Sequence, residues 1–245
     1  MNWKPDRTAM LRTCLVSLLC LSPAISSMFV QAHESPYLRK YKAEVPPVEE
    51  NPGRRESAGI RGDCLPRNQK LTVLVPENQV TLTTSPYPTF FFYVPTSEAE
   101  EAIFVLFDDN DREIYKSIIK VSEMSGLLKV SIPDILNSPN LEPGKNYLWQ
   151  FYLICNPTDD SKNPFVEGLV QRVPLSVDIS TELESASESQ KVDIYADAGI
   201  WQEALTTLSD LRQANPNNLF LEKKWNELLE NIGLEQLAQE PMIEP

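Results

Sequence analysis

Apolar and alternating segments recur through the middle of the chain and predict β-strands. One of them, Tyr147–Cys155, is aromatic or aliphatic except for Gln150 and the closing Cys155. This composition is typical of a strand that is buried on both faces of a sheet. Because side chains alternate along a strand, Trp149 and Cys155 fall on the same face, which we expect to point into a core.

Further segments show the apolar runs or the alternation of short strands, and turn residues such as Glu142-Pro143-Gly144-Lys145 separate them. These segments are Leu71–Pro76, Val80–Thr84, Thr89–Pro95, Ala102–Phe107, Glu113–Val121, Gly126–Ile132 and Phe165–Val177. No helical pattern interrupts them. The arrangement predicts an Ig-like antiparallel β-sandwich over residues 61–178.

After Ser180 the apolar positions recur at helical spacing, so residues 181–240 are expected to form a helical segment. The fold class is therefore mainly β with an α tail (α+β). The stretch Ala198–Leu205, closed by Asn215-Pro216, resembles the second half of a tetratricopeptide repeat. A plain helical hairpin with coincidental spacing explains the same residues. Because such repeats are stable only in arrays of about three, we expect the helices to pack on the sandwich.

The N-terminus has the pattern of a secretory signal peptide. Basic residues precede an apolar stretch, and Val30-Gln31-Ala32 fits a cleavage site with cutting after Ala32. Serines within the apolar stretch disfavour the alternative, an uncleaved membrane anchor. Residues 1–32 are thus expected to be removed, and the Pro-rich residues 33–60 to form a disordered lead. The mature protein would be periplasmic or secreted.

Cleavage would remove Cys14 and Cys20 and leave Cys64 and Cys155. In an exported chain such a pair indicates a disulfide, with two free thiols as the alternative. No Cys-x-x-Cys is present, so a thiol redox site and a zinc knuckle both lack their signature.

Charge and histidine content exclude several classes of function. The chain has 22 basic and 35 acidic residues, and loss of residues 1–32 changes the net charge from −13 to −15. This acidity disfavours nucleic acid and anionic membranes as partners. The single histidine, His33, would be the first mature residue, so hydrolases and metal sites that need histidine have no support. We expect no cofactor and no catalytic residue.

Several local motifs suggest chemistry, and each has a simpler explanation. Asp108–Asp111 could hold calcium, but these residue types also form hairpin turns. Aromatic residues at Tyr87 and Phe90–Tyr93 could stack on sugar rings, although a strand that is apolar on both faces belongs in a core. Arg54, Arg55 and Arg61 could contact an anion, and Arg61-Gly62-Asp63 spells an integrin tripeptide by coincidence.

Several segments in order resemble a family of cyanobacterial secreted proteins known as domain of unknown function 928. They are Arg54–Cys64, Leu71–Pro76, Phe92–Pro95, Tyr147–Cys155 and a tail with Trp201, Trp225 and Gly233-Leu234. The resemblance implies export and a cyanobacterial source. It implies no activity, because the family has none assigned.

The leading hypothesis is an exported, non-enzymatic interaction module that binds a protein partner. The acidic helical tail would offer the docking face, with Trp201, Leu205 and Trp225 as the contact residues. A carbohydrate-binding module of the cell envelope is the alternative. A hydrolase that uses a pair of carboxylates is a more distant one, because too many acidic residues are available to select a pair.

Overall fold

A computed structural model describes residues 53–57, 64–77, 80–136 and 138–244. The described residues all belong to one compact unit. The expected signal peptide, most of the expected lead and the Arg61-Gly62-Asp63 triplet lie outside the described residues.

The larger sheet has the strand order β1-β9-β8-β5-β6, and β3 also pairs with β9. Its strands are β1 (Gly53–Arg54), β3 (Thr81–Thr83), β5 (Glu101–Phe107), β6 (Glu113–Lys120), β8 (Asn146–Leu153) and β9 (Phe165–Arg172). The smaller sheet has the order β10-β7-β4-β2. Its strands are β2 (Thr72–Val73), β4 (Thr89–Val94), β7 (Gly126–Ser131) and β10 (Met242–Ile243).

Two features of the sheets differ from the sequence predictions. Pairings of β3 with β9 and of β10 with β7 are parallel, whereas an antiparallel arrangement was expected throughout. The short strand β1 and the bridge from Glu56 to Thr72 lie within the segment expected to be a disordered lead. Backbone hydrogen bonds to β9 and β2 order this segment, because its neighbours supply partners that its polar composition does not reveal.

The two sheets face one another across an aromatic core. Phe92 of the smaller sheet stacks on Phe151 of the larger one with ring centroids 4.1 Å apart, and Phe90 contacts Phe104 at 4.9 Å. Trp149 is 1 % exposed, as its position in the alternation predicted. A Cβ at Gly168 would lie 2.6 Å from Cζ2 of this indole, so the neighbouring strand needs glycine at that position.

Four helices follow the last long strand, so the chain is α+β and mainly β. They are α1 (Val177–Ser185), α2 (Glu188–Asp197), α3 (Trp201–Ala214) and α4 (Leu219–Glu230), with short 3-10 turns at Asp160–Lys162 and Glu235–Leu237. Ser187 and Gln190 form a capping box at the start of α2, and the Asn218 side chain caps α4. Gly199, at φ 79°, allows the reversal between α2 and α3.

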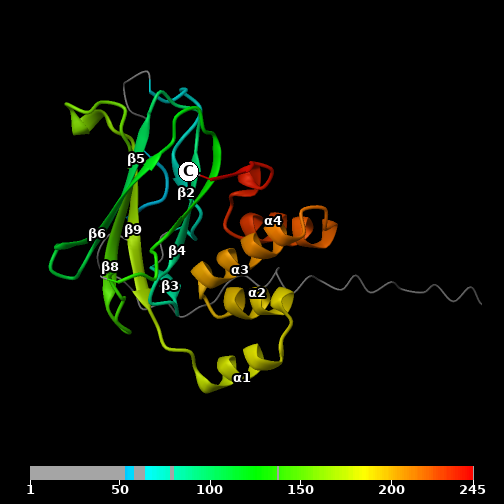
Figure 1. Ribbon diagram of the computed structural model, residues 1–245. Helices are drawn as coiled ribbons and strands as arrows, with labels where there is room; N and C mark the ends of the chain where they lie inside the picture. The colour runs from blue at the N-terminus through cyan, green and yellow to red at the C-terminus, as the bar shows by residue number, and fades with distance from the viewer. Residues whose placement is uncertain (1–52, 58–63, 78–79, 137, 245) are drawn as a thin grey trace, which may run out of the picture. The chain divides into compact units, whose positions relative to one another are not determined.

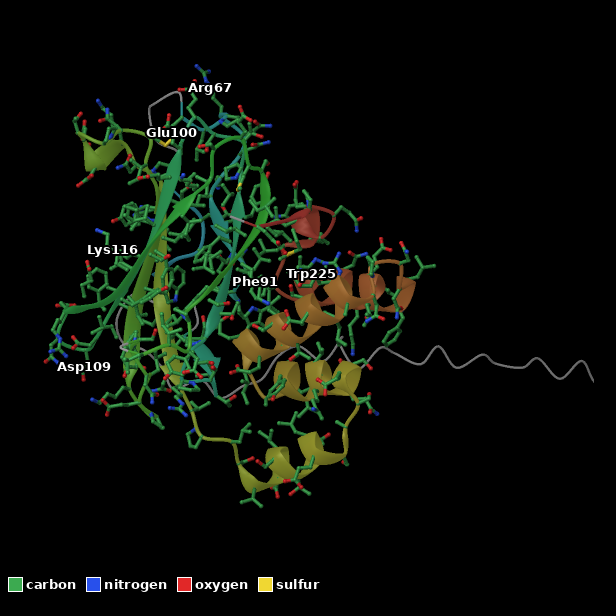
Figure 2. The ribbon with its side chains drawn as sticks, in the orientation of Figure 1. Arg67, Phe91, Glu100, Asp109, Lys116 and Trp225 are labelled. Atoms are coloured by element: carbon green, nitrogen blue, oxygen red, sulfur yellow. A yellow bond between two sulfur atoms is a disulfide. The ribbon has the colours of Figure 1, made fainter. Side chains whose placement is uncertain are left out.

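The helices are joined to the sheets through α3, which packs against β4 of the smaller sheet and against β3, a short strand of the larger sheet (Figure 1). Nε1 of Trp201 donates a hydrogen bond to the Leu74 carbonyl at 2.7 Å. Phe91, which points away from the core between the sheets, is 1 % exposed because it lies on the helical side (Figure 2). The expectation that the helical tail packs on the β domain is confirmed.

The carboxylate of Glu203 connects α3 by hydrogen bonds to the end of β3 and the segment that follows it. Its Oε1 accepts four hydrogen bonds, from Thr83 Oγ1 at 2.8 Å, Thr84 N at 2.8 Å, Thr84 Oγ1 at 3.0 Å and Ser85 N at 2.8 Å. Hydrogen bonds to a charged acceptor are stronger than neutral ones. A single side chain therefore satisfies most of the polar groups of this turn.

We expect Glu203→Gln to lower the free energy of unfolding by on the order of 1.5–3 kcal/mol, because a neutral amide replaces the charged acceptor. Glu230→Gln, at the exposed end of α4, is the matched control and should change stability by less than about 0.5 kcal/mol. Urea unfolding followed by far-UV circular dichroism measures both. Equal stabilities of the two variants would contradict this role of Glu203.

The disulfide expected from the sequence is present. Cys64 and Cys155 are bonded, with their Cα atoms 5.7 Å apart. The bond ties the segment that precedes β2 to the end of β8. Asn163 supports this end of the strand, since its Oδ1 accepts hydrogen bonds from the backbone N–H groups of Cys155 and Asn156.

Candidate functional site

The outer face of the larger sheet carries apolar side chains that the helices leave uncovered. We call this surface the open face. It consists of Ile103 and Phe107 from β5, Lys116 and Ile118 from β6, Leu148, Gln150 and Tyr152 from β8, Phe165, Glu167 and Leu169 from β9, and Arg54 from β1, whereas Val105 of β5 lies on the same side but is buried. Figure 1 shows the four helices on the side of β4, and Figure 2 shows Lys116 on the side away from them.

The burial of β8 differs from the prediction. Its apolar composition predicted burial on both faces, but only the residues that face the smaller sheet are buried. Leu148, Gln150 and Tyr152 remain partly exposed. Likewise, Ile118 on β6 is 60 % exposed. A strand with apolar residues on a solvent-facing side is unusual, because exposed apolar surface is unfavourable unless something covers it.

Strand register arranges these side chains in rows across the sheet. One row runs Ile118, Ile103, Tyr152 and Phe165 through four neighbouring strands. Neighbouring strands lie about 4.8 Å apart, so these side chains contact one another along the row. The guanidinium of Arg54 covers the end of the row, 4.5 Å from the ring centroid of Phe165.

A second row brings polar groups into the middle of the apolar surface. It runs Lys116, Val105, Gln150 and Glu167. Nε2 of Gln150 donates to Oε2 of Glu167 at 3.0 Å, which fixes the orientation of both side chains. In the first row, burial raises the pKa of Tyr152, with further contributions from Asp160 and Glu113. Its hydroxyl therefore stays protonated and can donate a hydrogen bond at neutral pH.

The open face has the composition of a binding surface. It combines a continuous apolar area with a few fixed polar groups, as protein interfaces do. Within the described ranges, no group of three or more His, Cys, Asp or Glu residues could hold a metal ion. Among the same residues, no helix has the length and apolar character needed to cross a membrane.

The residues predicted to contact a partner lie elsewhere and are buried. Trp201 is 1 % exposed, and Leu205 and Trp225 are both fully buried. They pack between the helices and the smaller sheet, so a partner that docks on the folded chain cannot contact them. The prediction of these three contact residues therefore needs correction. Helical periodicity identifies an apolar stripe, and here the chain itself covers that stripe.

The aromatic residues considered for sugar stacking also belong to the core. Phe90, Phe91 and Phe92 are at most 1 % exposed and Tyr93 is 7 % exposed, whereas Tyr87 is partly exposed. Of the arginines considered for an anion, Arg54 stacks on a ring. The guanidinium of Arg55 donates to the Ile232 carbonyl at 2.7 Å. Arg61 lies outside the described residues.

The Asp108–Asp111 segment forms the turn between β5 and β6 (Figure 2 labels Asp109). Oδ1 of Asp108 accepts hydrogen bonds from the backbone N–H groups of Asn110 and Arg112, both at 3.0 Å. Its Oδ2 accepts from the side chain of Arg112. Asp111 adopts φ 57°, which Asp tolerates better than most residues. Hydrogen bonds within the turn thus account for its acidic composition.

Because of these hydrogen bonds, we expect the contribution of Asp108 to stability to depend on pH. The backbone N–H of Arg112, the N–H of Asn110 and the Arg112 side chain lower the pKa of Asp108. A carboxyl group with a lowered folded-state pKa stabilises the fold above its unfolded pKa of about 3.9, and this stabilisation is lost as pH falls through the folded value. We expect Asp108→Asn to destabilise the protein at pH 7, and this difference from the wild type to vanish in strong acid.

Thermal unfolding of the variant and the wild type at several pH values measures this difference. The exposed neighbour Asp109 provides the control, since its carboxylate accepts a hydrogen bond from the Asn110 side chain and none from Arg112. A stability difference for Asp108→Asn that is the same at pH 7 and in strong acid would contradict the prediction.

Sequence reasoning missed the open face, although a weak signal exists. Gln150 interrupts the apolar run of β8, and Lys116 and Glu167 occupy alternating positions in their strands. A polar residue in the middle of an otherwise apolar strand indicates the side that meets water. Only the strand order shows that these three residues fall in one row.

Comparison with known proteins gives a family and nothing closer. The model of a family described as Domain of Unknown Function (DUF928) matches residues 56–242, which is more than half of the chain. No curated protein and no solved structure matches the chain.

Proposed function

This chain belongs to the DUF928 family, and because the family description assigns no activity, we propose from the surface of the chain that it is a non-enzymatic interaction module whose open face binds a protein partner. The observation that carries this proposal is the uncovered apolar row Ile118–Ile103–Tyr152–Phe165. A contiguous apolar area on an otherwise acidic chain is stabilised when a partner covers it.

The composition of the open face favours a protein over a carbohydrate. Aliphatic side chains make up much of its area, namely Ile103, Ile118, Leu148 and Leu169. Sugars stack on aromatic rings, whereas branched aliphatic groups pack best against other apolar side chains. The hydroxyl of Tyr152 and the Gln150–Glu167 pair would then fix how the partner is positioned on this surface.

The setting of this function is part of the proposal. We place the protein in the periplasm or outside the cell of a cyanobacterium, because its N-terminus has the pattern of a cleaved signal peptide. A disulfide suits such an oxidising compartment. We further propose that the β domain is an Ig-like sandwich and that α2 and α3 derive from a tetratricopeptide-like hairpin.

Site-specific photo-cross-linking in cells that carry the native gene tests the proposal. A photoreactive phenylalanine analogue replaces Ile118 on the open face, and in a control protein it replaces Leu219. Leu219 is a matched control because it is 77 % exposed but lies on α4, on the helical side. Mass spectrometry identifies what is attached to each protein.

A defined protein adduct from position 118, absent from position 219 and lost when Tyr152→Ser is added, would support a partner on the open face. A polysaccharide adduct from position 118 would instead favour the carbohydrate-binding alternative. The proposal fails if position 118 gives no adduct, or if both positions give the same products.

A further inference from the structure

A groove separates the C-terminal strand from the ends of α3 and α4, and it is independent of the open face. Its volume is about 400 Å³. We call it the C-terminal groove. It is lined by Lys129, Ser209, Arg212, Gln213, Asn215, Pro216, Asn218, Glu222, Met242, Ile243 and Glu244.

Arg212 is the cation in this groove that lacks an anionic partner. Its guanidinium lies 4.7 Å from the ring centroid of Trp225. Among the described residues it forms no hydrogen bond and no ion pair. Burial lowers the pKa of Arg212, and the more distant Glu222 offsets this only in part. Its planar set of N–H donors is therefore held in place and left without an acceptor, an arrangement that suits a carboxylate.

Several other polar side chains of the groove already have partners. Nζ of Lys129 pairs with Asp210 at 2.5 Å, and Nε2 of Gln213 donates to Glu244 at 3.0 Å. The side-chain amide of Asn215 donates to the Leu211 carbonyl, and Asn218 caps α4. A ligand that carries a negative charge thus meets the guanidinium of Arg212 beside the apolar side chains of Pro216 and Met242, in a groove that the carboxylates of Glu222 and Glu244 also line.

The groove is lined in part by the end strand of a sheet. Strand β10 is the end strand of the smaller sheet and pairs with β7 on one side. Three consecutive residues, Met242 to Glu244, line the groove, although their side chains alternate in direction. Part of the lining is therefore backbone. In the part of the chain that the structure describes, no strand pairs with the other edge of β10, so an extended peptide can add there.

We propose that the C-terminal groove binds the end of a partner polypeptide, which adds to β10 as an extended strand and places its terminal carboxylate on the guanidinium of Arg212. An apolar last side chain would pack against Met242, which is 39 % exposed. The occupant is the end of a chain because β10 has only two residues and so pairs with few residues of a partner.

A peptide array tests the proposal without knowledge of the partner. Randomised octapeptides are displayed with a free C-terminal carboxylate and, in parallel, with a C-terminal amide, and labelled full-length protein is applied to both. We expect binding to the carboxylate series only, with apolar residues enriched at the last position. The best peptide is then titrated by fluorescence anisotropy against variants of the protein.

We expect Arg212→Gln to lower the affinity for this peptide by at least about tenfold, because the substitution removes a charged hydrogen-bond donor. Arg212→Lys keeps the charge and should recover part of the affinity. Arg67→Gln, at an exposed arginine far from the helices in Figure 2, is the control and should leave the affinity unchanged. Circular dichroism verifies that each variant is folded.

The proposal is overturned if no peptide binds, if the amide series binds equally well, or if folded Arg212→Gln and Arg212→Lys both retain wild-type affinity. None of these results bears on the open face, because that surface lies on the other sheet. The cross-linking experiment and the array therefore fail or succeed separately.

Discussion

Replacing Asp193 with alanine is expected to lower the free energy of unfolding by about 3–5 kcal/mol, one of the largest effects available in this chain. Nζ of Lys224 on α4 lies 2.6 Å from the Asp193 carboxylate on α2 and donates to the Ser189 carbonyl at 2.7 Å. The lysine side chain is 2 % exposed, whereas that of Asp193 is 29 % exposed. Without Asp193, a buried ammonium loses its carboxylate partner.

Because Lys224 and Asp193 differ in exposure, we expect their replacement to lower the free energy of unfolding by different amounts. Lys224→Met removes the buried charge itself and leaves a carboxylate that water can reach, so we expect a loss of about 2 kcal/mol. The double variant Asp193→Ala/Lys224→Met should be more stable than Asp193→Ala alone, because it no longer buries an ammonium that has lost the Asp193 carboxylate. Urea unfolding of all four proteins gives the coupling between the two residues.

Surface ion pairs on the same helices supply the controls. Glu188→Ala on α2 and Lys223→Met on α4 each break an exposed pair and should cost less than about 1 kcal/mol. If Asp193→Ala lowers the free energy of unfolding by no more than these controls do, the charge of Lys224 is not buried in the way that the structure shows. A double variant no more stable than Asp193→Ala would contradict the argument from exposure.

Removing the disulfide should have an effect of similar size. Cys64 and Cys155 are separated by 91 positions, and closing a loop of this length stabilises the fold by about 4–5 kcal/mol through the entropy of the unfolded chain. We expect the Cys64→Ser/Cys155→Ser protein to lose roughly this amount. Urea unfolding of the oxidised wild type and the double variant measures the difference.

The wild type unfolded in the presence of a reducing agent is the control for the serine substitutions. It should match the double variant, since both lack the bond. The reductant should leave the stability of the double variant unchanged. A variant within about 1 kcal/mol of the oxidised wild type would show that the bond does little to constrain the unfolded chain.

Much of the secondary structure could be predicted because it depends on neighbouring residues. Alternation and turn residues located the long strands to within a few positions, from β4 at Thr89–Val94 to β8 at Asn146–Leu153. Asn215-Pro216, expected to close the first helical stretch, does follow the last residue of α3. The two-residue strands β1 and β10 were missed, because long-range pairing forms them and a period cannot be read from two residues.

The candidate sites could not be predicted in the same way. The apolar residues of β8 and those of α3 look equivalent in the sequence, yet Trp201 became core and Tyr152 stayed at the surface. What decides between them is the sheet on which the helices dock. That choice depends on contacts between distant residues, such as Trp201 with Leu74 and Glu203 with Thr83.

By itself, then, the sequence determined the class of the fold, the pairing of Cys64 with Cys155 and the family. These depend on local periodicity, on cysteine number and on the order of short motifs. Only the tertiary structure decided which apolar residues remain uncovered and which arginine lacks an acceptor. The physical reason is that burial and hydrogen bonding depend on contacts between residues that are far apart in the chain. The type of one residue does not indicate which distant residue it will contact.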